Sequence, residues 1–167
     1  MIKKYTILVV DDEELFIEYI QRMMSDENYN VVTAASAQEG LDILEKQQVS
    51  MVISEYEIPL INGLEFLEKV RIIYPNILTV MVTEHADIDL AIKAINEAGV
   101  YKFLLKPLDD IDFKNMIKKT LESLQVIKER DVLIRKVKTH ESTLKDLEKR
   151  YPGITKVERD EDGYILP

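Results

Sequence analysis

The 167-residue chain is long enough for one ordinary domain and an appendage, and 46% of its residues are hydrophobic, which excludes disorder throughout. It contains no cysteine, so disulfides and thiolate metal sites are excluded, in keeping with a reducing cytoplasm. No stretch approaches the ~18 apolar residues of a membrane span, and the first apolar run is too short for a signal peptide. We therefore expect a cytoplasmic protein with no membrane partner.

The net charge of −9 is distributed unevenly along the chain. Residues 1–113 hold 9 basic and 21 acidic residues, residues 114–150 hold 11 and 6, and residues 151–167 hold 2 and 4. Nucleic-acid binding needs a basic face on a folded module, and here the larger part of the chain is acidic. We therefore expect no nucleic-acid partner, although the basic segment leaves a DNA-binding transcription regulator as an alternative to a solvated helix of mixed charge.

Five short apolar runs alternate with segments that have the spacing of helices. The expected strands are residues 6–10, 30–34, 49–54, 78–82 and 101–105, and the expected helices are residues 14–26, 38–47, 62–73, 88–97 and a last one from about Asp109. Strict alternation predicts an α/β fold, a doubly wound five-stranded parallel sheet of flavodoxin-like strand order 2-1-3-4-5. All runs except the second are almost continuously apolar, which is typical of strands covered on both faces.

The last helix should extend to residue 149 or 150. From residue 130 onward it has the 3,4 spacing of a coiled-coil seam. The seam positions are Leu133, Val137, His140, Leu144, Leu147 and Tyr151. A helix this long and polar would fray alone, so we expect a homodimer through residues 123–151 with the two helices parallel. The alternative is a helix that folds back on its own globule. His140 fits a tolerated polar seam residue better than a metal ligand.

Three parts are expected along the chain: a globular domain at residues 1–122, a coiled-coil helical extension at residues 123–150 and a β-hairpin tail at residues 151–167. Pro152 and Gly153 should end the helix. Gly163 then follows three acidic residues at a position that favours a hairpin turn. Because an isolated hairpin is marginally stable, it should pack against the coiled coil or against its twin in a dimer.

Polar side chains follow four of the expected strands where each strand ends. They are Asp11 and Asp12, Glu55 and Glu57, Thr83, and Lys106. These strands are neighbours in the expected order, so their side chains should converge at one edge of the sheet. Like charges at ~4 Å cost about 4 kcal/mol at an effective dielectric of 20, and a divalent cation with oxygen ligands, Mg²⁺, would relieve this repulsion. Lys106 supplies a second positive charge, Thr83 supplies a hydroxyl donor, and His85 stands alone on a loop.

Four segments carry a specific resemblance: ILVVDDEE, SEYEIPLINGLEFL, MVTE and FLLKP, in this order. Together they resemble the receiver domain of two-component response regulators over residues 3 to about 122. The resemblance implies that Asp11, Asp12 and the backbone of Glu57 hold magnesium beside the phosphoacceptor position, residue 55. It also implies that Thr83 and Lys106 bind phosphoryl oxygens, and that Thr83 and Phe103 form a switch. The implied partners are a histidine kinase or phosphotransfer protein and a downstream protein.

Two positions depart from the family pattern. Residue 55 is Glu in place of the phosphoacceptor Asp, which moves the carboxylate ~1.5 Å outward and disturbs the positioning that phosphoryl transfer requires. The longer side chain should point toward Thr83 and Lys106 and partly imitate a phosphoryl group, although with one charge instead of nearly two. Glu84 stands where the family usually has a small residue, and it should crowd or repel an incoming phosphoryl group.

We expect a signal-transduction receiver module of a phosphorelay, with a non-phosphorylatable or phosphomimetic site at Glu55 and output through dimerisation or protein interaction. The alternatives are a conventional response regulator with an engineered Asp-to-Glu change, a receiver phosphorylated on Glu55 or elsewhere, a transcription regulator, and a purely structural dimer. An enzyme is not expected, because the chain has no Ser-His or Cys-His pair and no glycine-rich phosphate cradle.

Overall fold

The computed structural model describes residues 5–25, 27–85 and 87–154. The strands are β1 (Tyr5–Val10), β2 (Tyr29–Ala34), β3 (Met51–Glu55), β4 (Leu78–Thr83) and β5 (Lys102–Leu105). The helices are α1 (Glu14–Met23), α2 (Ala37–Lys46), α3 (Gly63–Ile73), α4 (Ile88–Asn96) and α5 (Asp110–Arg150). The chain divides into two compact units, Met1–Glu122 and Ser123–Pro167, and the division falls within α5.

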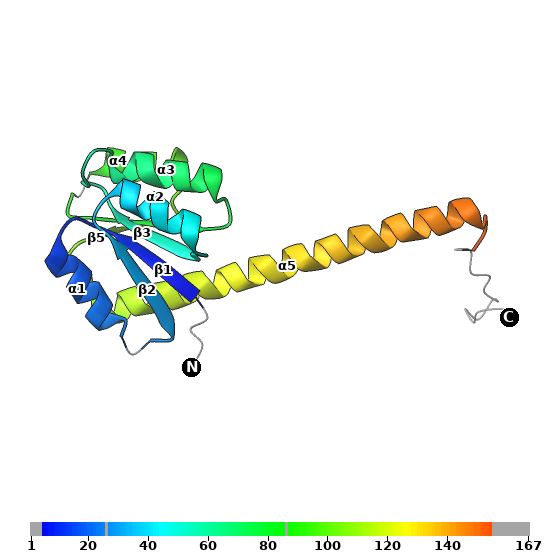
Figure 1. Cartoon of the computed structure of the whole chain (residues 1–167), viewed down its shortest axis with the longest axis horizontal. Coiled ribbons are helices and arrows are strands. Elements are labelled where there is room, and N and C mark those ends of the chain that lie inside the picture. Colours follow the sequence, from blue (N-terminus) through cyan, green and yellow to red (C-terminus); the bar gives the residue numbers. More distant parts are fainter. Residues whose placement is uncertain (1–4, 26, 86, 155–167) are drawn as a thin grey trace. The chain divides into compact units, whose positions relative to one another are not determined.

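The strands of the first unit form one parallel sheet in the order β2-β1-β3-β4-β5, which confirms the predicted fold class. Helices α2, α3 and α4 cover one face of the sheet, and α1 with the first part of α5 covers the other (Figure 1). The registers pair Val10 with Ser54, Glu55 with Val82, and Thr83 with Leu105. The carboxyl ends of four neighbouring strands therefore finish together.

The fifth strand corrects one prediction. We expected β5 to be covered on both faces, but Lys102 and Leu105 are exposed, Leu105 to 45%, and Phe103 and Leu104 are only half-buried. β5 is the last strand of the sheet and pairs with β4 alone. The predicted strand order already placed residues 101–105 at an edge of the sheet, but a continuous apolar run does not show how much of such a strand is covered.

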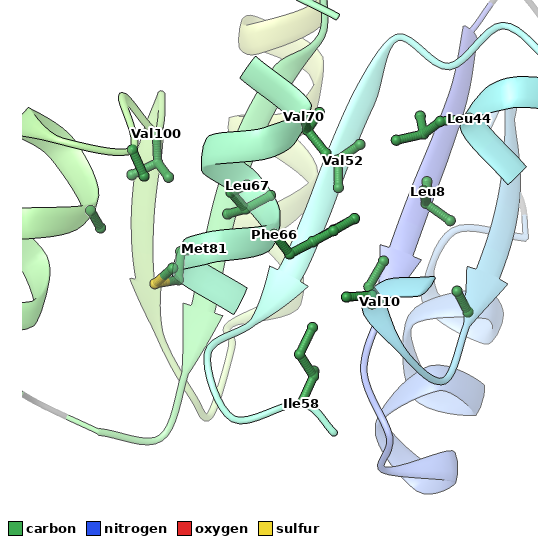
Figure 2. Packing of buried hydrophobic residues seen from close by; sticks show 14 of the residues in the cluster. Leu8, Val10, Leu44, Val52, Ile58, Phe66, Leu67, Val70, Met81 and Val100 are labelled. Atoms are coloured by element: carbon green, nitrogen blue, oxygen red, sulfur yellow. The ribbon is translucent and has the colours of Figure 1, made fainter. Parts of the chain in front are cut away.

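The core between the sheet and helices α2 and α3 is built around Phe66, which is fully buried and reaches toward Val10 and Val52 (Figure 2). The helix backbones come close at this ring, because a Cβ atom on Gly40 of α2 would lie 3.0 Å from Phe66 Cζ. Truncating such a ring typically costs ~3–5 kcal/mol. The tight packing holds α2 and α3 in fixed positions on the strands that carry the polar edge.

Gly63 brings the start of α3 against the end of β3. A Cβ atom at this position would lie 1.9 Å from the backbone oxygen of Glu55, and the Gly63 amide donates a 2.7 Å hydrogen bond to Tyr56 O. Asn62 caps the helix by accepting a hydrogen bond from the amide of Glu65. Only glycine permits this approach, so the loop after β3 fixes the backbone at Glu55.

Leu60 has a strained backbone and gives a stability prediction. Its φ angle is 75°, and its side chain is 94% exposed. A β-carbon in the left-handed region costs roughly 1–2 kcal/mol, and Asn tolerates this region better than Leu. Leu60→Asn should raise the free energy of unfolding by about 0.5–1 kcal/mol in urea denaturation. Leu60→Ala, which keeps the same penalty, is the control; equal stability of the two variants would contradict the prediction.

The second unit contains the rest of α5 and a turn at residues 151–154. After Arg150, the Tyr151 amide donates to Leu147 O, and Gly153 has a φ of 93° and donates to the carboxylate of Glu148. The predicted β-hairpin lies outside the described residues. No described helix is long and apolar enough to cross a membrane.

Candidate functional site

The centre of the polar edge is the Lys106 ammonium, which binds carboxylates from two strand ends. Its Nζ lies 2.9 Å from Asp11 Oδ2, 3.0 Å from Glu55 Oε2 and 3.6 Å from Glu13 Oε2. The side chain of Lys106 is 8% exposed, and Asp11 and Glu55 are 1% and 8% exposed. The peptide bond from Lys106 to Pro107 is cis. The predicted convergence of Asp11, residue 55 and Lys106 is thus present in the structure.

The Glu55 carboxylate is bound through both oxygens. Oε1 accepts hydrogen bonds from the amides of Tyr56 at 2.6 Å and Glu57 at 3.4 Å, and Oε2 faces Lys106. Each of these contacts is charge-assisted and lies in a largely buried setting, where such bonds are strong. Glu55 is therefore an anion whose acceptors are turned toward two backbone amides and one ammonium.

Thr83 is fully buried at the end of β4, but it is not joined to Glu55 by any hydrogen bond among residues 5–25, 27–85 and 87–154. Its Oγ1 accepts a 3.3 Å hydrogen bond from the amide of His85. Glu55 thus contacts Lys106, as expected, and makes no such hydrogen bond to Thr83. Phe103, the other predicted switch residue, is half-buried and packs against the core cluster.

His85 is not alone, contrary to the expectation from the sequence. Its Nε2 lies 3.0 Å from Glu57 Oε1, so the two side chains bridge the loops that follow β3 and β4. Both residues stand two positions beyond a strand end, Glu57 after Glu55 and His85 after Thr83. That equal offset on neighbouring strands is the signal that could have revealed the pair. Both partners are exposed, so the contact contributes little stability.

A hollow of about 270 Å³ opens at this edge. It is lined by Asp11, Asp12, Glu13, Glu55, Glu57, Glu84, His85 and Lys106. Hard oxygen donors of this kind suit Mg²⁺, which usually takes one or two carboxylates and keeps several waters. Among the described residues, no three acidic or histidine side chains converge as a ready-made metal cage, because Asp11 and Glu55 face Lys106. The donor chemistry fits magnesium. Asp12 is exposed in the lining of the hollow and is not among the carboxylates that pair with Lys106 in the described residues.

The buried charges shift one another's protonation. Burial raises the pKa of Asp11, against the opposing effect of its hydrogen bonds to Lys106 and to the amide of Glu13. Burial alone would lower the pKa of Lys106, but its hydrogen bonds to Asp11 and Glu55 outweigh burial and raise the pKa. The ammonium therefore stays charged at neutral pH and offsets the repulsion between the two carboxylates.

Removal of the ammonium should be costly. Lys106→Met leaves two buried carboxylates facing each other without a cation, and breaking a buried ion pair in this way typically costs ~3–5 kcal/mol. We expect the free energy of unfolding at neutral pH to fall by about 3 kcal/mol in a denaturant titration. Lys102→Met, on the exposed start of β5, is the matched control and should stay within about 0.5 kcal/mol of the unmodified chain. Equal losses in the two variants would contradict this account.

A second, larger hollow shares Lys106 with the first. Its volume is about 690 Å³, and its lining is Glu13, Leu15, Phe16, Tyr19, Glu84, Lys106, Pro107, Leu108 and Asp110. Leu15 is exposed there, although it is a large apolar residue. The two hollows share Glu13, Glu84 and Lys106, so a hollow lined by both apolar and acidic residues adjoins the carboxylate site.

The fold and the site together define a class of α/β signalling domain whose functional edge combines acidic residues with a buried lysine. The family model described as "Response regulator receiver domain" matches residues 7–118, and the chain belongs to this family. The resemblance of the four sequence segments is thereby confirmed.

Known proteins support the same assignment. The chain is 37% identical over 105 residues to the hydrogenase transcriptional regulatory protein HoxA of Cupriavidus necator, covering 63% of this chain and 22% of HoxA. It is 29% identical over 115 residues to sporulation initiation phosphotransferase F of Bacillus subtilis, covering 69% and 92% of the two chains. A signal receiver domain of an HD domain-containing protein from Pseudomonas fluorescens superposes with a TM-score of 0.74 at 30% identity, over 78% of this chain and 96% of that one.

The chain spans about a fifth to a third of the length of the transcriptional regulators that it matches. The similarity to these regulators therefore concerns the receiver domain and does not extend to the activities of the whole regulators.

Proposed function

We propose that this receiver domain signals from a fixed carboxylate at Glu55 and passes its state on through self-association or protein interaction. The observation that carries the proposal is the 3.0 Å contact between Glu55 Oε2 and Lys106 Nζ, at a position where the family has a phosphoacceptor Asp. In a conventional receiver this lysine would bind phosphoryl oxygens. Here it already binds an anion that belongs to the chain itself.

Two further features argue against phosphoryl transfer to Glu55. Both carboxylate oxygens are engaged, one by two amides and the other by Lys106, so neither is presented freely for in-line attack. Glu84 is an exposed residue in the lining of the hollow and adds negative charge there, which disfavours the approach of an anionic phosphodonor. The single charge of Glu55 makes it a partial mimic, because a phosphoryl group carries nearly two charges.

Magnesium is proposed as the metal of this edge. Asp11 and Asp12, with the backbone carbonyl of Glu57 and the carboxylate of Glu55, are the donors that would hold the ion. A bound Mg²⁺ would neutralise the carboxylates around it and would organise phosphate oxygens in a conventional receiver. In this chain Lys106 already neutralises part of the negative charge of these carboxylates. Magnesium should therefore adjust the charge of the site without being required for its formation.

Self-association is proposed for the second part of the chain, with a coiled-coil extension at residues 123–150. The seam positions Leu133, Val137 and Leu144 are exposed on α5, Leu133 to 61%, and Tyr151 is exposed just after the end of α5. Val126, Leu133, Ile134 and Val137 also line an apolar hollow of about 580 Å³. A regular apolar stripe on a long polar helix is the surface that a second copy would cover.

A protein partner is proposed for the larger hollow of the first unit. Its lining includes the apolar or aromatic residues Leu15, Phe16, Tyr19, Pro107 and Leu108, which suit the apolar face of a helix. The acidic residues in the same lining favour basic residues on that helix. A histidine kinase or phosphotransfer protein would fit there next to residue 55, and so would a downstream partner. The similarity to a named phosphotransferase supports this class of partner.

Removal of the Glu55 charge tests the proposed signalling role. Glu55→Gln keeps the side-chain size but removes one of the carboxylates that pair with Lys106, so that Asp11 and Glu13 remain. The signalling state that favours self-association should therefore be less populated. We expect the dimer dissociation constant from sedimentation equilibrium to rise about tenfold, the usual scale of coupling between sites. Glu68→Gln, an exposed glutamate on α3, is the control and should leave the constant unchanged. If magnesium and Glu55→Gln both leave dimerisation and partner binding unaltered, the receiver is a structural adaptor instead.

Regulation of transcription is the second candidate function, because several relatives are named as transcriptional regulators. The basic charge of residues 114–150 is the feature of this chain that favours it. A salt-dependent shift of duplex DNA at about micromolar protein would support direct DNA contact, and the absence of a shift would restrict the chain to protein interactions.

A further inference from the structure

The Lys106 ammonium has an aromatic neighbour in addition to its carboxylates. Its Nζ lies 3.8 Å from the centre of the Phe16 ring on α1. Contacts between a cation and a ring are stronger when the cation is desolvated than at an exposed site. Lys106 is 8% exposed, so the desolvated case applies, and the Phe16 ring helps to set where the ammonium stands.

Phe16 is held by the same residues that bind the lysine. Asp11 Oδ1 accepts a 2.9 Å hydrogen bond from the amide of Glu13, and the carbonyl of Glu13 accepts a 3.1 Å hydrogen bond from the amide of Phe16. The other oxygen of Asp11 binds Lys106. The first turn of α1 is thus fixed relative to the ammonium, so the contact between Phe16 and Lys106 does not depend on a flexible side chain alone.

Tyr19 extends this contact to the start of α5. It stands three residues after Phe16 on α1, where side chains share a face, and the two ring centres are 6.1 Å apart at an interplanar angle of 41°. The Tyr19 hydroxyl contacts the carbonyl of Leu108 at 3.3 Å and donates to the carboxylate of Asp110, the first residue of α5.

The Tyr19 hydroxyl remains a donor under ordinary conditions. Burial, the hydrogen bond to Asp110 and the charges of Asp110 and Asp109 raise the pKa of Tyr19 to about 12. The hydroxyl therefore keeps its proton at neutral pH and remains able to donate to the first turn of α5. A continuous set of contacts joins the carboxylate site to α5 through Lys106, Phe16 and Tyr19.

We propose that Phe16 is the positioning residue of the Lys106 ammonium, and that Phe16 with Tyr19 couples the charge at residue 55 to the first turn of α5. The proposal rests on the signalling role proposed for Glu55. When the charge of Glu55 is lost, the ammonium keeps only Asp11 and Glu13 and moves relative to the ring. The ring pair then shifts, and the Tyr19 hydroxyl changes its contact with Asp110.

This route differs from the switch of Thr83 and Phe103 that the resemblance implies. Thr83 Oγ1 is occupied by the amide of His85, and no hydrogen bond within the described segments connects it to Glu55. Lys106, in contrast, contacts both Glu55 and Phe16 directly. A signal could also pass from Lys106 to Asp110 along the main chain of residues 106–110. Removal of the Tyr19 hydroxyl would leave that main-chain route intact, so it can be distinguished from the route through Phe16 and Tyr19.

The test compares the response of α5 to Glu55→Gln in several backgrounds. The response is the amide chemical-shift change of residues 110–113 in ¹⁵N-labelled full-length chain. Phe16→Leu and Tyr19→Phe should each reduce this response at least about threefold, whereas Phe16→Tyr, which keeps a ring, and Phe103→Leu should preserve it. The methylene protons of Lys106 supply an independent signature: the ring-current shift from Phe16 should vanish in Phe16→Leu and remain in Phe16→Tyr.

An unreduced response in both Phe16→Leu and Tyr19→Phe would overturn the proposal, and so would a loss confined to Phe103→Leu. If Phe16→Leu fails to fold, Tyr19→Phe decides, because it removes only a hydroxyl. A response of α5 that is present while both the dimer dissociation constant and partner binding stay unaltered would refute the proposed function and leave the coupling intact. A changed dissociation constant without any response of residues 110–113 would refute the coupling alone.

Discussion

The Glu55→Asp variant should take up one phosphoryl group from a small phosphodonor in the presence of magnesium, whereas the unmodified chain should not. Asp shortens the side chain by ~1.5 Å, which frees the space next to Lys106 and returns the carboxylate to the geometry of the family. A misplacement of this size can cost about 10²-fold in rate, so the difference should be at least of that order. Intact-mass measurement over time reports the adduct directly.

The controls for this experiment distinguish the reactivity of residue 55 from the access of the phosphodonor to it. Glu55→Gln has no carboxylate at residue 55 and should remain unmodified. Combining Glu55→Asp with Glu84→Ala should speed the uptake further, because this removes a negative charge from the lining of the hollow. A stoichiometric adduct on Glu55 of the unmodified chain would overturn the claim of a fixed carboxylate. An inert Glu55→Asp variant would mean that other parts of the site also prevent phosphoryl transfer.

Leu144→Asp should convert a dimer into a monomer. The side chain of Leu144 is half-exposed in the isolated chain and would be buried in the proposed seam. In a parallel pair, two carboxylates would meet in an apolar layer, at a cost of several kcal/mol for each desolvated charge. We expect a dissociation constant about 10³-fold higher, because each 1.4 kcal/mol corresponds to a factor of ten.

Light scattering at tens of micromolar provides the measurement. The unmodified chain should give about twice the chain mass of 19.4 kDa, and the Leu144→Asp variant should give the mass of a single chain. Ser142→Asp, on the exposed face away from the seam positions, is the matched control and should remain dimeric. Far-ultraviolet circular dichroism should show a loss of helix in Leu144→Asp, since a long polar helix frays when unpaired. A clean monomer of the unmodified chain would remove the coiled-coil proposal.

The local sequence pattern was sufficient for the sheet and for the residues at its edge. Buried parallel strands are apolar almost throughout, and helices between them repeat apolar residues every three to four positions, so both leave a signal over five to ten residues. Strand order then follows from the alternation and from the matched segments, and it places Asp11, Glu55, Thr83 and Lys106 at one edge. The resemblance of ILVVDDEE and FLLKP pointed to the same edge.

Tertiary structure alone decided how those side chains are paired. Three pairings depend on distances across separate loops and helices. Glu55 binds Lys106 and not Thr83, His85 contacts Glu57, and the Phe16 ring lies against the Lys106 ammonium. The predicted order placed β5 at an edge, but the exposure of its side chains is seen only in the folded chain. A linear pattern records which residues belong to each element, but hydrogen bonds and ion pairs form between elements, and a change of a few ångströms there selects a different partner.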